Sequence, residues 1–425
     1  MRAVKLPLLL LSAVLCLHAP LSAQDAPLTL ERAVALALER NERPAIAETT
    51  VEAADARLRR ARGAFLPRVD VSGNWRNDFT EDTERTLSTA ALLTQPIFDA
   101  RAFPLFRQAR FQRQAARFDA DETKRLLGFD AAAVFLTVLS FEEVLRAAEH
   151  RRDFAQTNLE DVRARFDAGL VSSNDVTRAE LELATAVRGV AQAVGNVQAT
   201  RVDLENLLKT DSIGALAPPT ALLEAAAAPP STNIPAAQQR RSDIAAERAS
   251  VEALRAFADE PNARFLPSVL FNAQTRNIND GPLASRNNEG FFGFTLAWPV
   301  FDSGVRRAER AERNALVRGA ELELESSLRD VERQLRTAAV QLSTEQAALR
   351  EATAAVRAAR KNADETTVLY REGLASALEL ADATQRLFEA EVAEATATYR
   401  MALAYLSLRE ASGASPAGAP GGGEG

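Results

Sequence analysis

The chain has almost no cysteine or histidine. Its 425 residues include one cysteine, Cys16, and two histidines, His18 and His150. Cys16 and His18 lie in an N-terminal segment that we expect to be removed, so the mature chain has no thiol and a single imidazole. His150 stands between Glu149 and Arg151 in a helical stretch, where a lone histidine is far more often solvated than a base or a metal ligand. This composition argues against cysteine nucleophiles, disulfides and histidine-ligated metals.

Catalytic motifs are missing as well. The sequence has no HExxH, no GxSxG and no Gly-rich phosphate loop. Acid pairs such as Glu142 with Glu143, and Glu321 with Glu325, occur in helical stretches near arginines, which is typical of a solvated helix face. We therefore predict no enzyme, no cofactor and no metal site. The net charge of −7 also argues against a nucleic-acid partner.

Long apolar runs are missing beyond the N-terminus. Residues 1–23 begin with Arg2 and Lys5, continue as LPLLLLSAVLCL and end in LSA, which is the pattern of a cleavable secretory signal. Leu15 is too bulky for the small residue expected before a lipidated cysteine, so Cys16 does not predict a lipoprotein. No later run approaches the roughly 20 apolar residues of a membrane-spanning helix. We expect an exported chain.

Glycine and proline are few, and they gather at positions that recur along the chain. Three pairs of segments match at offsets of about 200 residues. They are GAFLPRVDVSGNW (63–75) with ARFLPSVLFNAQT (263–275), LLTQPIFDAR (92–101) with TLAWPVFDSG (295–304), and the segments around Gly169 and Gly373. This self-similarity predicts a tandem duplication. Its expected parts are a first structural repeat over 24–213, a Pro/Ala-rich linker over 214–235, a second repeat over 236–412 and a disordered tail over 413–425.

Each repeat contains two segments that alternate like strands. We expect strands at about 65–77, 86–98, 265–277 and 290–301. Strands of about 9 to 11 residues with one apolar face and aromatic ends are typical of a transmembrane β-barrel, although a soluble sheet with one wet face is the alternative for any single strand. The expected aromatic girdle is Trp75, Phe292, Phe294 and Trp298. Because four strands cannot close a barrel and an open edge is not tolerated in lipid, several chains must share it.

Helical periodicity follows each second strand with almost no interruption. We expect long helices over about 99–168 and 302–372, and shorter return helices over about 173–209 and 376–412. Nearly 70 residues of helix extend roughly 100 Å, which favours a coiled coil or a stack of two helices. Asp99 and Asp302 are expected helix N-caps. The fold class is therefore mainly α, with long helical hairpins and a β-barrel part.

A Gly-Leu pair separates the two helices of each hairpin. Gly169 and Gly373 can end the long helices in the left-handed conformation, and Leu170 and Leu374 can pack back on the last turn. These two turns are expected at the tip of the molecule, about 100 Å from the strands.

The order and spacing of these segments resemble the TolC-like outer-membrane efflux protein family. The resemblance rests on LTLERAVALALERNERPAIAETTVEAADARLRRARGAFLPRVDVSG, on QPIFDA and WPVFDSG, and on the two Gly-Leu turns. It implies a homotrimer in the outer membrane of a Gram-negative bacterium, with four strands per protomer in a twelve-stranded barrel surrounded by outer-membrane lipid. It also implies a periplasmic helical tunnel whose tip turns meet a periplasmic adaptor protein, loaded by an inner-membrane pump. The expected function is a passive exit duct.

The resemblance implies a periplasmic gate at the tip. In the family, acidic residues lie six and nine positions after the second glycine, and here those positions hold Glu379 and Asp382. Asp175 and Arg178 are the first-repeat equivalents, and we expect Tyr370 to join them as a lock. Three copies of the two acids would form rings that favour cations. Alternatively, they are exposed acids near a helix start.

Two other functions fit the sequence. The same fold could be the exit duct of a type I protein-secretion system, which the sequence does not distinguish from a tripartite pump. A coiled-coil scaffold of the envelope, with its strands in a soluble sheet, would need neither detergent nor a membrane.

Overall fold

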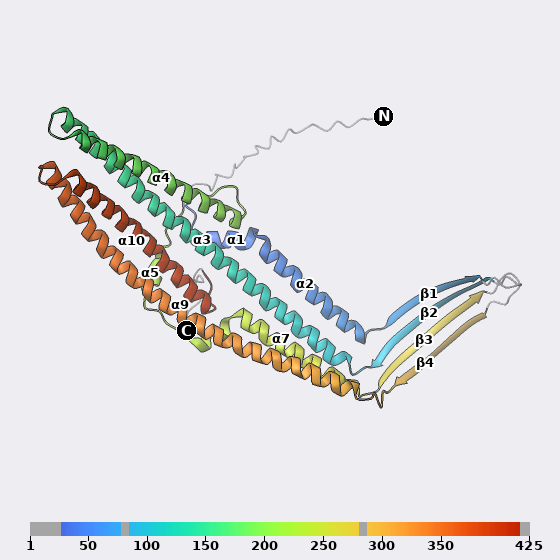
Figure 1. Cartoon of the computed structure of the whole chain (residues 1–425). Coiled ribbons are helices and arrows are strands. Elements are labelled where there is room, and N and C mark those ends of the chain that lie inside the picture. The colour runs from blue at the N-terminus through green and yellow to red at the C-terminus, as the bar shows by residue number, and fades with distance from the viewer. Residues whose placement is uncertain (1–26, 78–84, 280–286, 417–425) are drawn as a thin grey trace, which may run out of the picture.

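The molecule is an elongated rod with a sheet at one end and two helical turns at the other (Figure 1). The computed structural model describes residues 27–77, 85–279 and 287–416. The predicted signal peptide over 1–23 lies outside these residues, as do the centres of the two polar loops between paired strands and residues 417–425 of the predicted tail.

Four strands form one antiparallel sheet in the order β1-β2-β3-β4. They are β1 (Arg68–Asn77), β2 (Arg85–Phe98), β3 (Ser268–Asn279) and β4 (Asn287–Ala297). β1 and β4 form the two outer edges, and each edge is paired on one side only within the chain. The central β2–β3 pair joins the two halves of the sequence.

The register gives the sheet one apolar and one polar face. Val69 lies opposite Leu93, Leu93 opposite Ala273, and Ala273 opposite Phe292, so one row of the apolar face crosses all four strands. The neighbouring row, on the other face, includes Arg68, Thr94 and Asn272. The apolar side chains are exposed in the single chain, with Val71 at 78% and Phe292 at 78%. Period-2 alternation thus places apolar groups on a surface that nothing in the chain covers.

Two long helices connect the sheet to the tip. They are α3 (Ala102–Asp167) and α9 (Val305–Arg371), of 66 and 67 residues, and each is a single unbroken helix. The return helices α4 (Ser173–Leu208) and α10 (Ala377–Ala411) pack on α3 and α9 respectively. On the half nearer the sheet, α2 (Glu42–Arg62) and α7 (Ser242–Ala258) take the place of the return helices (Figure 1).

The hydrophobic core is concentrated in the middle of the rod. There α1 (Leu30–Arg40), α3, α4 and α10 bury Phe135, Leu136 and Leu204 completely. A second cluster joins α5 (Thr220–Ala227), α6 (Ile234–Arg240) and α7 to α9 and α10. Short elements, η1 (Gly63–Phe65) and α8 (Glu260–Ala263), lead into β1 and β3. Among the described residues, no helix combines the length and apolarity that a membrane crossing requires.

The predicted linker over 214–235 contains regular structure. It holds the whole of α5 and the start of α6. Ala226 is fully buried against the second core cluster, and the Gln346 side-chain amide donates to the carbonyl oxygens of Ala226 and Ala228 at 2.8 and 2.7 Å. The alanine-rich composition that suggested a linker instead forms a small, tightly packed helix.

The prediction that disorder begins at residue 413 was wrong for the first four residues. Gly413 turns the chain with a φ of 73°, and the Arg409 side chain donates to the Ser415 carbonyl at 2.9 Å. Pro416 is buried over Gly128, where an added Cβ would lie 2.9 Å from the proline ring. The missing side chain at Gly128 therefore makes room for this end of the described chain.

Asp99 and Asp302 are not the N-cap residues that we expected. The N-caps are Arg101 and Gly304, two residues later. Each aspartate first closes a turn, since the carbonyl of Asp99 accepts from the Ala102 N–H and that of Asp302 accepts from the Val305 N–H, both at 3.1 Å. Gly304 adopts the left-handed conformation, and the Asp302 carboxylate accepts from the Arg306 N–H at 3.0 Å. Asp302 therefore bonds one of the first backbone N–H groups of α9, although it does not occupy the N-cap position.

Candidate gate at the helical tip

Both tip turns end their long helix with the same backbone geometry. Gly169 and Gly373 have φ of 73° and 76°, and an added Cβ would meet no atom within 4 Å at either position. Glycine is therefore favoured here by its backbone conformation and not by lack of space. The Leu170 N–H donates to the Arg165 carbonyl and the Leu374 N–H to the Leu369 carbonyl, each at 2.8 Å. These six-to-one bonds define Schellman motifs, which confirms the predicted helix ends.

The two leucines of these turns do not pack back on the helices as expected. Leu170 is 73% and Leu374 is 75% exposed. The turns extend past the last residues that could cover them, so the backbone bonds alone close the helices. Two apolar side chains are thereby presented to solvent at the end of the molecule.

Capping boxes begin both return helices. The Asp175 carboxylate accepts from the Ser172 N–H and hydroxyl at 3.0 and 2.9 Å, and the Glu379 carboxylate accepts from the same groups of Ser376 at 2.7 and 2.9 Å. The Ser376 N–H and then its hydroxyl hold the pKa of the Glu379 carboxyl below its ordinary value. Both acids therefore fix the start of a helix, and Glu379 remains ionised at neutral pH.

The five residues predicted to form the gate do not bond to one another. Within the described chain, no hydrogen bond or ion pair joins any two of Asp175, Arg178, Tyr370, Glu379 and Asp382. Asp382 instead pairs with Arg386 one turn later at 2.7 Å, and both side chains are more than half exposed. Asp175 and Arg178 line a narrow crevice against the start of α10, which Glu379 and Asp382 do not line. The structure therefore places the second-repeat acids on an open surface, apart from the first-repeat pair.

Tyr370 is the buried member of this set. It packs with Leu159 and Val162 of α3, Ala179 of α4 and Leu380 of α10, so its ring joins the two hairpins. Its hydroxyl is buried without a hydrogen-bond partner among the described residues. Burial raises the pKa of the Tyr370 hydroxyl above its ordinary value, and the Asp175 carboxylate adds to that shift.

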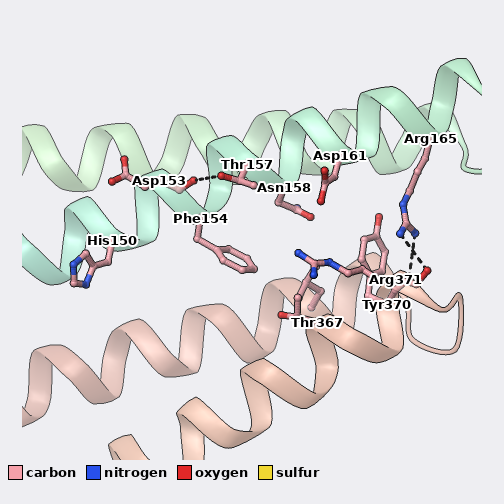
Figure 2. A pocket seen from close by; sticks show the side chains of 11 residues that line it. His150, Asp153, Phe154, Thr157, Asn158, Asp161, Arg165, Thr367, Tyr370 and Arg371 are labelled. Carbon is pink, nitrogen blue, oxygen red and sulfur yellow. Dashed lines mark hydrogen bonds between the residues drawn. The ribbon is translucent and has the colours of Figure 1, made fainter.

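Arg165 forms a clamp between the hairpins that the sequence analysis missed. From the last turn of α3 it donates to the carbonyl oxygens of Tyr370 and Arg371 at 3.3 and 3.1 Å, as Figure 2 shows. Its guanidinium carbon also lies 5.5 Å from the centre of the Tyr370 ring. One cation thus bonds two carbonyl oxygens at the end of α9, of which that of Tyr370 also accepts from the Gly373 N–H, and it stacks on the residue that joins the hairpins.

The clamp crosses a place where the two long helices are apart. A groove of about 480 Å³ separates α3 from α9 beside Arg165, with Phe154 and Leu380 in its apolar part (Figure 2). His150 lies at one end of this groove and is exposed, as expected. The packing between the hairpins comes mainly from α10 against α3. Separating the tips therefore requires breaking the Arg165 bonds and exposing Tyr370.

One signal in the sequence could have identified the clamp. When Gly169 is aligned with Gly373, Arg165 falls on Leu369 and Phe166 on Tyr370. The positive charge of Arg165 and the hydroxyl of Tyr370 each have no equivalent in the other repeat. Such a difference between the repeats suggests a contact between them. Periodicity alone does not reveal it, because an arginine in a last helical turn has a sufficient local explanation.

The predicted aromatic girdle lies on the apolar face of the sheet. Phe292 and Phe294 occupy alternate positions on β4, and Trp75 lies on the same face near the far end of β1. Trp298 comes directly after the last residue of β4. Trp298 is 60% exposed, and its indole N–H donates to the Phe265 carbonyl at 3.0 Å. An indole with its N–H bonded at the end of a strand suits a membrane interface. The two tryptophans lie toward opposite ends of the strands, as a girdle on each side requires.

Known proteins resemble the chain over nearly its whole length. A sequence model described as "Outer membrane efflux protein" matches residues 33–209 and 233–414. Outer membrane protein TolC of Escherichia coli K12 is 22% identical over 402 residues, covering 85% of this chain and 77% of the relative. The cobalt-zinc-cadmium resistance protein CzcC of Cupriavidus metallidurans is 23% identical over 377 residues, covering 86% and 85%. The crystal structure of outer membrane protein VceC from Vibrio cholerae superposes with a TM-score of 0.76 at 17% identity, covering 91% of this chain and 96% of that one.

Proposed function

Because this chain belongs to the outer membrane efflux protein family, we propose that it is the outer-membrane exit duct of a tripartite efflux system. In this proposal the signal over residues 1–23 is cleaved, the mature protein carries no lipid anchor, and three copies assemble around one axis. Substrate leaves through the assembly without any chemical step in this chain.

The observation that carries the proposal is the sheet. It has four strands, one continuous apolar face and two edge strands, β1 and β4, each with one side unpaired in the chain. In hydrocarbon an unpaired strand edge costs several kcal/mol per free backbone group, so the edges must be covered by other copies. Three copies of four strands give a twelve-stranded barrel, with the polar face around Arg68, Asn272 and Arg276 toward the lumen.

The tip is the proposed docking point for a periplasmic adaptor, which an inner-membrane pump loads. Leu170 and Leu374 project from rigid turns and are exposed, so they can insert into apolar sites between adaptor helices. The same end carries the proposed gate, where three copies each of Glu379 and Asp382 would favour cations and repel anions. Their exposure, and the ionised state of Glu379, support this role.

Recording in planar bilayers tests the proposal. The full chain, expressed with its signal and purified from outer membranes in detergent, should form a stable trimer that inserts spontaneously and conducts ions with cation selectivity. The doubly neutralised variant E379Q/D382N should keep the trimer and the pore but lose most of the cation selectivity and the block by multivalent cations. A detergent-independent monomer or dimer without pores would contradict the duct, whereas a pore with unchanged selectivity in the variant would contradict only the acidic gate.

A further inference from the structure

Arginine accumulates where the helices meet the sheet. In the four segments that adjoin it, residues 57–62, 99–113, 259–266 and 302–313, arginine outnumbers Asp and Glu by thirteen to six, although the chain as a whole has a net charge of −7. The first turns of α3 and α9 contain no acidic residue, although acids are favoured at that position, and the last turn of α2 is basic. The positive charge is therefore specific to the segments that adjoin the sheet, because the chain as a whole is acidic.

Most of the acids in these segments are already neutralised. Asp99, Asp259, Asp302 and Glu309 each pair with an arginine, and the buried Glu260 pairs with two. Seven exposed arginines of the same segments have no ion-pair partner within the described part of the chain. These seven residues, which we name the basic collar, are Arg57, Arg59, Arg60, Arg62, Arg110, Arg307 and Arg310.

The collar lies next to the end of the apolar sheet face. Trp298 marks that end, and the carbonyl that its indole binds belongs to Phe265, at the entrance to β3. Exposed Phe103 lies on the same face of α3 as Arg110, seven residues on, and Phe301 is 85% exposed just before α9. Arg310 is five residues into α9, roughly 8 Å along the helix axis. That distance is comparable to the thickness of one lipid headgroup layer.

We propose that the basic collar binds the phosphate groups of anionic phospholipids in the periplasmic leaflet of the outer membrane. The inference rests on the proposed function, because it needs the sheet to be in the bilayer. Guanidinium groups bind phosphate in a two-pronged geometry, and cations beside an anionic lipid surface each strengthen attachment. Seven unpaired cations lie beside an aromatic, apolar edge. This surface can contact both the charged headgroup and the acyl chains of a phospholipid. The collar would fix the depth of the barrel and prevent the rod from moving along the membrane normal.

Lipid selectivity can be measured with the protein's own tryptophan. The sequence has only two tryptophans, so W75F leaves Trp298 beside the collar as the single reporter. The W75F trimer is reconstituted into vesicles of phosphatidylcholine mixed with phosphatidylglycerol, with one lipid at a time brominated on its acyl chains. We expect Trp298 to be quenched more strongly by brominated phosphatidylglycerol, with a relative binding constant of about threefold or more over phosphatidylcholine. High salt should reduce this preference, because screening weakens exposed charge pairs.

Matched variants separate the collar from general charge effects. R307Q/R310Q should reduce the preference to about one, and R307K/R310K should retain part of it. The control R350Q/R357Q removes two exposed arginines of the same helix, far from the sheet, and should leave the preference unchanged. Equal quenching by the two lipids in the W75F protein would overturn the inference while the barrel stands. If neither brominated lipid quenched Trp298, the sheet would lie outside the bilayer, and the proposed function would fail together with the inference.

Discussion

The Arg165 side chain forms hydrogen bonds between the two hairpins, which none of the side chains that we predicted for the gate does within the described residues. It holds two carbonyl oxygens at the end of α9 and stacks on Tyr370, across a groove where α3 and α9 are otherwise apart. Charge-assisted bonds that are partly exposed contribute about 1–2 kcal/mol together. The neutral variant R165Q should therefore raise the equilibrium between open and closed tips by roughly 5- to 30-fold. In bilayer recordings, this change should appear as a larger open fraction at unchanged cation selectivity.

A neighbouring arginine provides the control for this prediction. Arg163 pairs with Glu180 at 2.7 Å, and both side chains are about half exposed, so R163Q removes an ion pair inside one hairpin and not between two. We expect R163Q to leave the open fraction unchanged, because such exposed pairs contribute little. Equal effects of R163Q and R165Q would show that loss of positive charge, and not loss of the clamp, opens the tip.

The sequence predicted the residues whose role follows from their own backbone conformation. It did not predict contacts between side chains that are distant in the sequence. The positions of Gly169 and Gly373 follow from local rules, because only glycine adopts the left-handed conformation without strain. The partners of Tyr370 in the first hairpin could not be predicted, since they lie about two hundred positions away in the sequence. The local bond of Asp382 to Arg386 could have been read from their spacing of four.

At the scale of one element, the capping box of α10 makes the tip sensitive to acid. The pKa of the Glu379 carboxyl is lower in the folded protein than in the unfolded chain. Its stabilisation is therefore complete above the unfolded value of about 4.3 and is lost as the pH falls through the folded value. We expect amide hydrogen exchange in a peptide covering residues 374–380 to be constant from pH 7 to pH 5 after correction for the intrinsic rate, and to accelerate below pH 4.

The variant E379Q is the internal reference for this measurement. Glutamine can still accept from the Ser376 N–H at every pH, so the capping box remains while its titration disappears. Exchange of the same peptide in E379Q should show no acid-induced acceleration. If both proteins accelerated alike below pH 4, the change would come from the whole tip and not from this cap.

The prediction of strands and helices from the sequence was reliable only where a residue pattern fits one kind of element and no other. Alternation through Phe292, Phe294 and Leu296 specified the strands, because a shift by one residue would reverse both faces. The helix starts were displaced from Asp99 and Asp302, because an aspartate can also close the turn before a helix. The stretch over 214–235 stays a predicted linker between the repeats, but composition did not predict that its alanines form the small buried helix α5.

At the scale of the whole molecule, the proposed barrel requires the two edges of the sheet to pair between different chains. β1 and β4 lie at opposite sides of one four-stranded sheet, so they cannot pair within a protomer without closing a barrel of four strands, and membrane barrels begin at about eight. In a closed assembly β4 of one protomer therefore lies beside β1 of the next. Such a head-to-tail interface forms a ring when the rotation closes.

Cysteine cross-linking tests this arrangement directly, because the only cysteine of the sequence lies in the predicted signal. Asn74 on β1 and Glu289 on β4 both lie on the polar face of the sheet and are separated within the chain by two intervening strands, so N74C and E289C combined in one chain should react between neighbouring chains. A short bifunctional thiol reagent should then convert the protein in outer membranes to covalent species up to a trimer on denaturing gels. The single variants N74C and E289C should remain monomeric on the same gels. Intrachain products alone in the double variant would mean that the sheet is not closed by neighbouring copies, and ladders beyond three chains would contradict a closed trimeric ring.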